Sequence, residues 1–389
     1  MKFLHTADLH IGKVVNDILL LQDRKFILEQ IKEIAVARKV DAVLVAGDIY
    51  DRAIPSGEAV LLLDEFLTAL SEAGIWVFLI SGNHDSAERL SFGERMLAEQ
   101  KIGIGSVYHE RPISFFMNKE EESVEVVLLP FIRPIHADAK TNNEAVEKML
   151  KCYWESVKCR EAEEQGDESF EKKIRRRILL THYFVTDAGK EPELSESETT
   201  VHVGGLDNVE ASLLSGFDYV ALGHIHKPQQ IGEKPIFYAG SPLKYSFGEV
   251  NGQKSVRYVE LCKDRPLQTE TIPLRPIREM RKVKGTLQEI MEKAVLEGPE
   301  REDYIQAILT DKNELIDPIG TLRSVYPNIM QLVREKPEEG LKTKSSSTII
   351  GKKEPLVLFE EFYELVYGEA LPKREQDIMQ EIMKRAEEE

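Results

Sequence analysis

The stretch WVFLISGNHD (residues 76–85) joins a short apolar run to a turn that contains Asn83, His84 and Asp85. The run is short and rich in leucine, isoleucine and valine, which is typical of a buried strand. A Gly-Asn turn alone would not require the His-Asp pair that follows it. The combination therefore predicts a strand followed by a turn with a chemical role.

Four other apolar runs share this design, since each is short, β-branched or leucine-rich, and ends in a small residue. They are KFLHTA (2–7), DAVLVAG (41–47), RILLT (177–181) and YVALG (219–223). Between the first two, apolar residues recur with helical spacing from Ile27 to Ala35, and helical patterns also fit 57–73 and 86–99. This alternation predicts a layered α/β fold.

Each of the five runs is followed by Asp, His or Asn. These residues are Asp8 and His10, Asp48, the Asn83-His84-Asp85 turn, His182, and His224 with His226. In open α/β sheets, ligands bind outside the carboxyl ends of strands. Small residues before the polar ones allow sharp turns and a close approach of the backbone. We therefore expect one site built from five separate segments.

The residue types indicate a pair of divalent metal ions. Two such ions need oxygen and imidazole ligands and one bridging carboxylate, and together they activate water for phosphoryl transfer. Two ions contribute four positive charges, of which the carboxylates of Asp8 and Asp48 neutralise two, so the remainder suits an anionic phosphodiester. A ligand set without thiolate favours manganese over a cysteine-rich zinc site. Each motif alone is common, and His182 alone would be an ordinary buried histidine, but the five together predict a metal site.

Composition excludes several classes of protein. The 389 residues are 42% hydrophobic and include three cysteines without a C-x-x-C pair, which argues against a disulfide framework or a cysteine zinc site. The start MKFLHTADLH does not fit a cleaved signal peptide, and no run approaches the roughly 18 apolar residues of a membrane span. We expect a soluble protein of the reducing cytoplasm that acts on the nucleoid.

Net charge does not decide the substrate. The value of −17 argues against nucleic acid, but the acidic residues gather in tracts such as 161–171 and 191–198. Basic residues dominate 172–177 and 275–284.

The later parts of the chain differ from the first. Residues 138–176 are highly charged and helical in pattern, so within a first domain at 1–275 they suggest an insertion outside the core. A small α+β unit is expected at 276–335 and a polar linker at 336–354. Residues 355–389 predict two short amphipathic helices.

The motif order D-x-H, GD, GNHD, H and GHxH resembles that of the calcineurin-like metallophosphoesterases. Within that superfamily the chain is most similar to the SbcD family, the nuclease subunits of SbcC–SbcD complexes that process DNA ends. The stretches FLHTADLHIGK, AGDIYDRAIPS, LISGNHDSAERLSF, FDYVALGHIHKPQ and YAGSPLKYSFGE carry the resemblance across residues 2–257. It implies a β-sandwich of two mixed sheets flanked by helices, followed by a small α+β capping domain and C-terminal helices.

The resemblance also implies roles for the site residues. One Mn²⁺ would be held by Asp8, His10, Asp48 and His226, and the other by Asp48 as the bridge, Asn83, His182 and His224. Mg²⁺ is a possible substitute. His84 would be catalytic and face the scissile phosphate, and Asp85 would orient the GNHD turn or the neighbouring imidazole.

SbcD-like activity would be 3′→5′ exonucleolytic on double-stranded DNA ends and endonucleolytic on single strands and hairpins. The chain lacks a G-x-x-x-x-G-K-[ST] loop, so ATP hydrolysis would belong to the partner SbcC, docked on 355–389. The resemblance further implies a homodimer within a heterotetramer. Candidate DNA contacts are Arg89, Arg278, Arg281 and Lys282. The alternative for them is local pairing with acids or a solvated strand edge.

Two other functions share the metal ligands. One is a phosphatase or cyclic-nucleotide phosphodiesterase for small substrates, which would not need the chain beyond residue 275. The other is a catalytically inactive scaffold, which is disfavoured because every motif residue, His84 included, is present.

Overall fold

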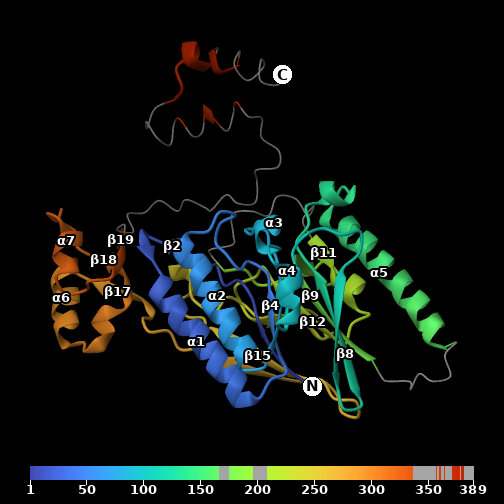
Figure 1. The fold of residues 1–389 in the computed structure, drawn as a ribbon. Coiled ribbons are helices and arrows are strands. Elements are labelled where there is room, and N and C mark those ends of the chain that lie inside the picture. The colour runs from blue at the N-terminus through green and yellow to red at the C-terminus, as the bar shows by residue number, and fades with distance from the viewer. Residues whose placement is uncertain are drawn as a thin grey trace. The chain divides into compact units, whose positions relative to one another are not determined.

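The computed structural model describes residues 1–165, 175–195 and 208–335, and parts of 356–380. The chain divides into two units, Met1–Glu335 and Lys336–Glu389, which we describe separately. In the first unit two six-stranded sheets pack face to face with helices on their outer faces (Figure 1). Both sheets are mixed, so the predicted sandwich of mixed sheets is confirmed.

The first sheet has the strand order β16-β15-β1-β4-β5-β6. Its strands are β1 (Lys2–Thr6), β4 (Ala42–Ala46), β5 (Trp76–Ile80), β6 (Ile102–Gly105), β15 (Ser255–Glu260) and β16 (Gln268–Pro273). The first four are parallel, whereas β15 runs antiparallel to β1 and β16 antiparallel to β15. The three N-terminal runs that the sequence predicted as strands are therefore neighbours in one sheet.

The second sheet has the order β13-β14-β12-β9-β8-β7. Its strands are β7 (Ile113–Lys119), β8 (Glu122–Leu129), β9 (Arg175–His182), β12 (Tyr219–Gly223), β13 (Gln229–Gln230) and β14 (Ile236–Tyr238). Strands β8, β9, β12 and β14 are parallel. The other two predicted strands, β9 and β12, thus lie in this sheet and not in the first.

Alternation along the central strands divides the core into three layers. In β4, Leu44 packs between the two sheets, whereas Val43 and Val45 point to the outer face under the helices. Strands buried on both faces have nearly continuous apolar sequences, which explains why AVLVA shows no alternation of polar residues. The sheets form one rigid frame for the loops at their strand ends.

Helices α1 (Leu21–Arg38) and α2 (Gly57–Glu72) cover the first sheet. Ile27, Ile31 and Ala35 are buried on the predicted face of α1. The weaker pattern at 86–99 forms two short helices, α3 (Ala87–Leu90) and α4 (Glu94–Glu99). Minor elements are β2 (Val14–Val15), β3 (Ile18–Leu19), β10 (Phe184–Thr186), β11 (Asn208–Glu210), η1 (Pro134–Ala137), η2 (Ala211–Leu214) and η3 (Phe247–Glu249).

The prediction that residues 138–176 lie outside the core is wrong for its helical part. Helix α5 (Asn142–Gln165) covers the outer face of the second sheet (Figure 1). Its charges occupy the exposed side, while a stripe of apolar side chains at helical spacing is buried against the sheet. That stripe consists of Val146, Met149, Leu150, Tyr153 and Val157. Residues 166–174 of the predicted insertion lie outside the described residues.

A third sheet of parallel strands follows the sandwich. It comprises β17 (Met280–Gly285), β18 (Tyr304–Leu309) and β19 (Ile329–Arg334), with α6 (Leu287–Leu296), η4 (Pro299–Glu302) and α7 (Pro318–Arg323) beside it. Its own hydrophobic cluster includes Ile290, Ile305 and Leu322. Met280 and Tyr304, however, pack into the core under α1, so this part and the sandwich form one compact unit.

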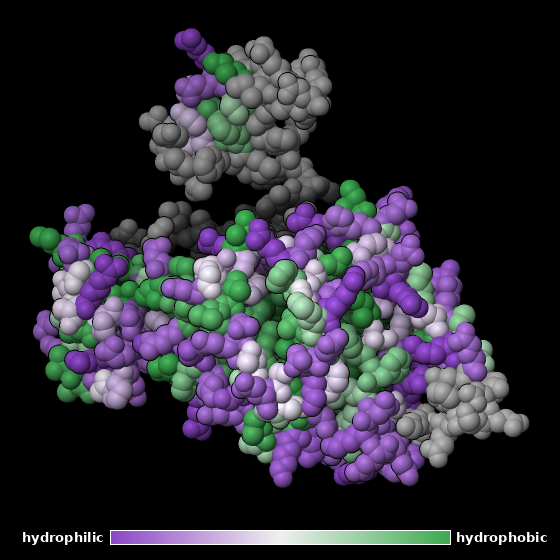
Figure 2. Space-filling view, viewed as in Figure 1, coloured by the Kyte–Doolittle hydropathy of each residue, from purple (hydrophilic) through white to green (hydrophobic). Residues whose placement is uncertain are grey.

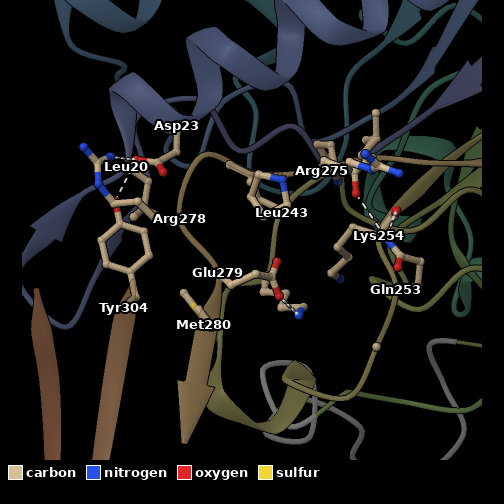
Figure 3. A pocket seen from close by; sticks show the side chains of 15 residues that line it. Leu20, Asp23, Leu243, Gln253, Lys254, Arg275, Arg278, Glu279, Met280 and Tyr304 are labelled. Carbon is tan, nitrogen blue, oxygen red and sulfur yellow. Dashed lines mark hydrogen bonds and ion pairs between the residues drawn. The ribbon is translucent and has the colours of Figure 1, made fainter. Parts of the chain in front are cut away.

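Polar contacts complete the junction between the third sheet and the sandwich. The Asp23 carboxylate accepts hydrogen bonds from Arg278 Nη1 at 2.9 Å and from the Tyr304 hydroxyl at 2.6 Å. Lys244 pairs with Glu279 at 2.5 Å. These residues line a pocket of about 260 Å³ at the junction (Figure 3).

The second unit contains short helical segments. Leu356, Phe359, Glu360 and Tyr363 are helical, as are 373–376 and 378–380. A hydrogen bond from Gln376 to Glu360 joins the two segments. The predicted linker 336–354 lies outside the described residues.

Hydrophilic side chains cover most of the described surface in the view of Figure 2. Within the described part of the chain, no helix combines the length and the apolar character needed to cross a membrane.

Candidate metal centre

The loops after β1, β4, β5, β9 and β12 meet at one end of the sandwich. The segments that follow β1 and β4 stay paired beyond the strands. The Asp8 amide donates to the Gly47 carbonyl at 3.0 Å, and the His10 amide donates to the Asp48 carbonyl at 2.9 Å. In the second sheet, His182 lies opposite Gly223 in register. The seven residues predicted as metal ligands are therefore delivered by two facing sheets.

Backbone strain is concentrated at this site. Asp8, His10, Asp48 and His224 have φ of 53°, 43°, 48° and 101°. Positive φ in a non-glycine residue costs of the order of 1–3 kcal/mol and persists only where the surroundings impose it. Here the conformation turns each side chain toward the space between the sheets.

Two glycines allow the loops to approach closely. A Cβ atom at Gly82 would collide with the Asp48 side chain, and one at Gly223 would collide with the Ala46 carbonyl. The small residues before the polar ones therefore serve close approach, as the sequence indicated.

One half of the site consists of Asp8, His10 and His226, which we call the first subsite. Their candidate ligand atoms lie within 4.8 Å of one another, and all three residues are buried. His10 Nε2 lies 3.2 Å from His226 Nε2 and 3.5 Å from Asp48 Oδ2. Burial lowers the pKa of His10 to about 4 and also lowers that of His226, so both imidazoles are neutral.

The other half consists of Asn83, His182 and His224, which we call the second subsite. His182 Nδ1 donates to the Ala46 carbonyl at 2.8 Å, so a neutral ring presents the Nε2 lone pair. That atom lies 3.1 Å from Asn83 Oδ1 and 3.4 Å from Asp48 Oδ2. His224 Nδ1 lies 3.1 Å from the same amide oxygen.

Asp48 lies between the two subsites. One carboxylate oxygen, Oδ2, is near His10 Nε2 and His182 Nε2, and the other accepts the His84 amide at 3.0 Å. Burial raises the pKa of Asp48, but His182 and His10 outweigh it and hold the pKa well below its usual value. Burial likewise lowers the pKa of His182, yet Asp48 raises it to about 9. Without a metal, a proton on His182 therefore supplies positive charge beside the Asp48 carboxylate, and a bound metal would take the place of that proton.

The donor set fits a pair of divalent cations. Carboxylate, amide and imidazole acceptors converge from both sheets, and lone pairs that face one another need a cation between them. The mixture of oxygen and nitrogen without sulfur suits a borderline-to-hard divalent ion.

His84 is exposed, unlike the buried residues Asp8, His10, Asp48, His182 and His226. Its Nδ1 hydrogen-bonds the Asp51 carbonyl at 3.0 Å, which leaves Nε2 as the ring nitrogen for a substrate. Its ring meets that of His10 edge-on at 4.9 Å. It also lies close enough to His10 and Asp48 for joint ligation, so geometry alone permits a ligand role as well.

Asp85 holds the turn in place. Its carboxylate accepts hydrogen bonds from the amides of Gly82 at 2.9 Å, Ile49 at 3.0 Å and Tyr50 at 2.8 Å. These bonds tie the GNHD turn to the loop after β4. They favour the orienting role for Asp85 over a direct part in catalysis.

The candidate DNA contacts divide into two groups. Arg278 is paired with Asp23, and Arg281 with Glu297 and Asp303, so both guanidinium groups are occupied by local acids. This arrangement favours the alternative of local pairing for both. Lys282 and Arg89 are exposed, and neither forms an ion pair within the described ranges.

Sequence reasoning did not single out Asp51. Its carboxylate pairs with Lys13 at 2.6 Å and lies 3.5 Å from His10 Nδ1, while its carbonyl accepts from His84. It therefore orients a first-subsite imidazole and the exposed histidine together. The signal was its place three residues after Asp48 in GDIYD.

Comparisons with known proteins agree with the fold and the motifs. Residues 1–228 match the family described as calcineurin-like phosphoesterase, and 276–367 match the type 5 capsule protein repressor C-terminal domain. A protein from Staphylococcus epidermidis, named as the SbcD component of the nuclease SbcCD, is 31% identical over 386 residues, which covers 98% of each chain. The chain belongs to the SbcD family. A second SbcD-family relative with the same name, from Staphylococcus saprophyticus, is 29% identical and covers 98% of each chain.

Solved structures show a more distant likeness to this SbcD-family chain. A dimetal phosphatase from Danio rerio is 13% identical with a TM-score of 0.42, covering 70% of this chain and 96% of its own. The protein TT1561 of Thermus thermophilus is 15% identical with a TM-score of 0.36, covering 69% and 98%.

Proposed function

We propose that this metallophosphoesterase is the nuclease subunit of an SbcC–SbcD complex and hydrolyses phosphodiester bonds in DNA with two Mn²⁺ ions. The observation that carries the proposal is the gathering of six acceptor residues around one buried carboxylate, Asp48. We assign Asp8, His10, Asp48 and His226 to one ion. Asp48, Asn83, His182 and His224 are assigned to the other, and Mg²⁺ is a possible substitute.

Bound metal would supply an activated water and positive charge beside the scissile phosphate. The chain's own residues position the substrate-facing imidazole. The Asp51 carbonyl, as acceptor for Nδ1–H, directs His84 Nε2 outward, and when both ring nitrogens carry protons the Nε2–H would stabilise charge on the phosphate or protonate the leaving oxygen. Asp85 keeps that imidazole in place by anchoring the turn.

The relatives' names and the match over 276–367 support DNA as the substrate over a small phosphate ester. We propose 3′→5′ exonuclease activity on double-stranded ends and endonuclease activity on single strands and hairpins. SbcC would dock on 355–389 and supply ATP hydrolysis, with two copies of this chain in a heterotetramer. We place the activity in the cytoplasm, on nucleoid DNA. Arg89 and Lys282 remain the proposed DNA contacts.

The test is cleavage of end-labelled duplex and hairpin DNA in Mn²⁺, Mg²⁺ or chelator, with and without SbcC. We expect DNA cleavage in Mn²⁺. The chelator should abolish this cleavage, and SbcC with ATP should stimulate it. p-Nitrophenyl phosphate and a cyclic nucleotide serve as comparison substrates. Efficient turnover of either one, with intact DNA under every condition, would overturn the proposal in favour of a small-substrate enzyme.

A further inference from the structure

Tyr245 lies beside the first subsite, on the segment between β14 and β15. It is buried, and its ring packs edge-on against two of the proposed ligands. The ring centroids are 5.3 Å apart for His10, with an interplanar angle of 88°, and 5.2 Å apart for His226, with an angle of 81°. The phenol ring therefore restricts both imidazoles at once.

The hydroxyl of Tyr245 reaches the third residue of the same subsite. It donates to the carbonyls of Asp8 and Leu9, at 2.9 and 3.0 Å. This stretch is strained, because Asp8 and His10 both have positive φ. A hydrogen bond to its carbonyls is thus placed where the backbone most needs support.

Arg24 holds the tyrosine in turn. Its guanidinium lies over the ring at 5.3 Å from the centroid, and its Nε donates to the Leu9 carbonyl at 3.0 Å. Arg24 is itself buried at the start of α1. Arg24 therefore contacts both the tyrosine ring and the main chain that the tyrosine hydroxyl supports.

The second subsite is arranged differently. Within the described ranges, the ring contacts and hydrogen bonds of Tyr245 involve no atom of Asn83, His182 or His224. There, His182 packs edge-on against His224 at 5.3 Å, and the Ala46 carbonyl fixes its tautomer. One side chain thus contacts every residue of one subsite and none of the other.

We infer that Tyr245 is a positioning residue that sets the metal affinity of the first subsite and leaves the second unaffected. Groups that orient metal ligands typically change affinity by about 10–100-fold when removed. The inference rests on the proposed two-metal centre and deepens it, because it separates the two ions.

Removal of the tyrosine should leave the main chain at His226 in place. The carbonyl of His226 accepts a hydrogen bond from the buried Lys254 ammonium at 2.9 Å (Figure 3 shows Lys254). That lysine also donates to Ser241 at 2.7 Å and pairs with Glu249 at 2.6 Å. Substitution at 245 therefore acts on the order of the two imidazoles and on the Asp8–Leu9 main chain, and not on the His226 segment.

The experiment is a titration of the full-length, metal-free protein with Mn²⁺. Calorimetry measures the affinities, and electron paramagnetic resonance detects the manganese pair. The wild type should bind two ions and show the spin-coupled signal of a manganese pair. Tyr245→Leu removes both ring and hydroxyl, and we expect one site about 10–100-fold weaker with the other unchanged. At two equivalents of Mn²⁺ the wild type should show the coupled signal, and the variant should reach it only at a higher Mn²⁺ concentration.

Tyr245→Phe keeps the ring and removes the hydrogen bond, so we expect a smaller loss of Mn²⁺ affinity at the same single site. This variant also tests the inference if Tyr245→Leu does not fold. Tyr219→Phe is the matched control, because that buried hydroxyl bonds His5 Nδ1 at 2.9 Å near the other end of β12. Its two Mn²⁺ affinities should equal those of the wild type. Unchanged affinities in both Tyr245 variants, or equal weakening of both sites, would overturn the inference. A wild type that binds no Mn²⁺ would overturn the proposed metal centre instead.

Discussion

At the scale of single residues, His84 and Asp48 are neighbours in space with different surroundings. The amide of His84 donates to the Asp48 carboxylate, yet His84 is exposed and Asp48 is buried between imidazoles. The exposed residue can meet a substrate, and the buried one can only meet what lies inside the site. We therefore assign catalysis to the first and metal bridging to the second.

His84→Ala should lower DNA cleavage by about 10²–10⁴-fold, the usual contribution of a positioned acid or base. The Mn²⁺ content should stay at that of the wild type, because the other seven residues remain. Cleavage of labelled duplex and metal analysis of the same sample test both statements. Metal content that falls together with activity would make His84 a ligand.

Asp48→Ala should lose bound Mn²⁺ and cleavage together, since the carboxylate lies next to His10 and His182 from the two facing sheets. Asp64→Ala removes an exposed carboxylate from α2 and is the control. Equilibrium dialysis against Mn²⁺ gives the stoichiometry. A variant that still bound two ions would exclude Asp48 as the bridge.

At the scale of elements, α5 combines a charged sequence with a structural role. Beyond its apolar stripe, it is held by an ion pair between Arg160 and Glu125 at 2.8 Å. Glu125 is fully buried in β8 and also pairs with Arg177 of β9 at 3.3 Å. The helix therefore covers the second sheet much as α1 and α2 cover the first.

Leu150→Ala should lower the free energy of unfolding by about 2–5 kcal/mol, because the side chain is buried among apolar neighbours. Lys151→Ala, on the exposed side of the same helix, should stay within about 0.5 kcal/mol of the wild type. Urea unfolding of the metal-free proteins measures both. Equal stability of the two variants would return 138–176 to the status of an insertion outside the core.

At the scale of the whole chain, the buried carboxylate of Asp23 is one of the contacts that join the third sheet to the sandwich. Asp23 accepts from Arg278 and Tyr304 while the adjacent Arg24 supports the Asp8–His10 loop. The start of α1 therefore contacts both the Asp8–His10 loop and the third sheet.

Asp23→Asn should loosen this junction, because an amide binds the arginine more weakly than a carboxylate does. We expect amides of β17 and β18 to exchange hydrogen faster while those of β4 and β5 do not change. Glu65→Gln weakens an exposed pair with Lys25 in the sandwich and is the control. Equal exchange in β17 of all three proteins would show that Asp23 does not hold the junction.

The second unit makes a separate prediction. Removal of residues 355–389 should abolish retention of SbcC on immobilised protein, and the truncated chain should still bind Mn²⁺. The substitution Phe359→Asp in the full-length chain should weaken the same retention. Full retention by the truncated chain would place the docking site elsewhere.

The residue types and their place after strands were sufficient to predict that these side chains gather at one site, because the strand ends of an α/β fold lie at one edge. The five strands could also be predicted from the sequence, because each is short, apolar and followed by a small residue. Helix α5 was misjudged because its charged residues outnumber those of its apolar stripe. The stripe nevertheless determines how the helix packs, since it is the part that is buried against the sheet.

Only the tertiary structure showed that the ligands come from two facing sheets, since no local pattern assigns a strand to its sheet. It also revealed the roles of Asp51, Lys254 and Tyr245, and the ion pairs of Arg278 and Arg281. These depend on contacts between segments up to 255 positions apart, such as that from Arg278 to Asp23. Residue type and local spacing carry chemistry and periodicity, but a long-range contact exists only once the chain has packed.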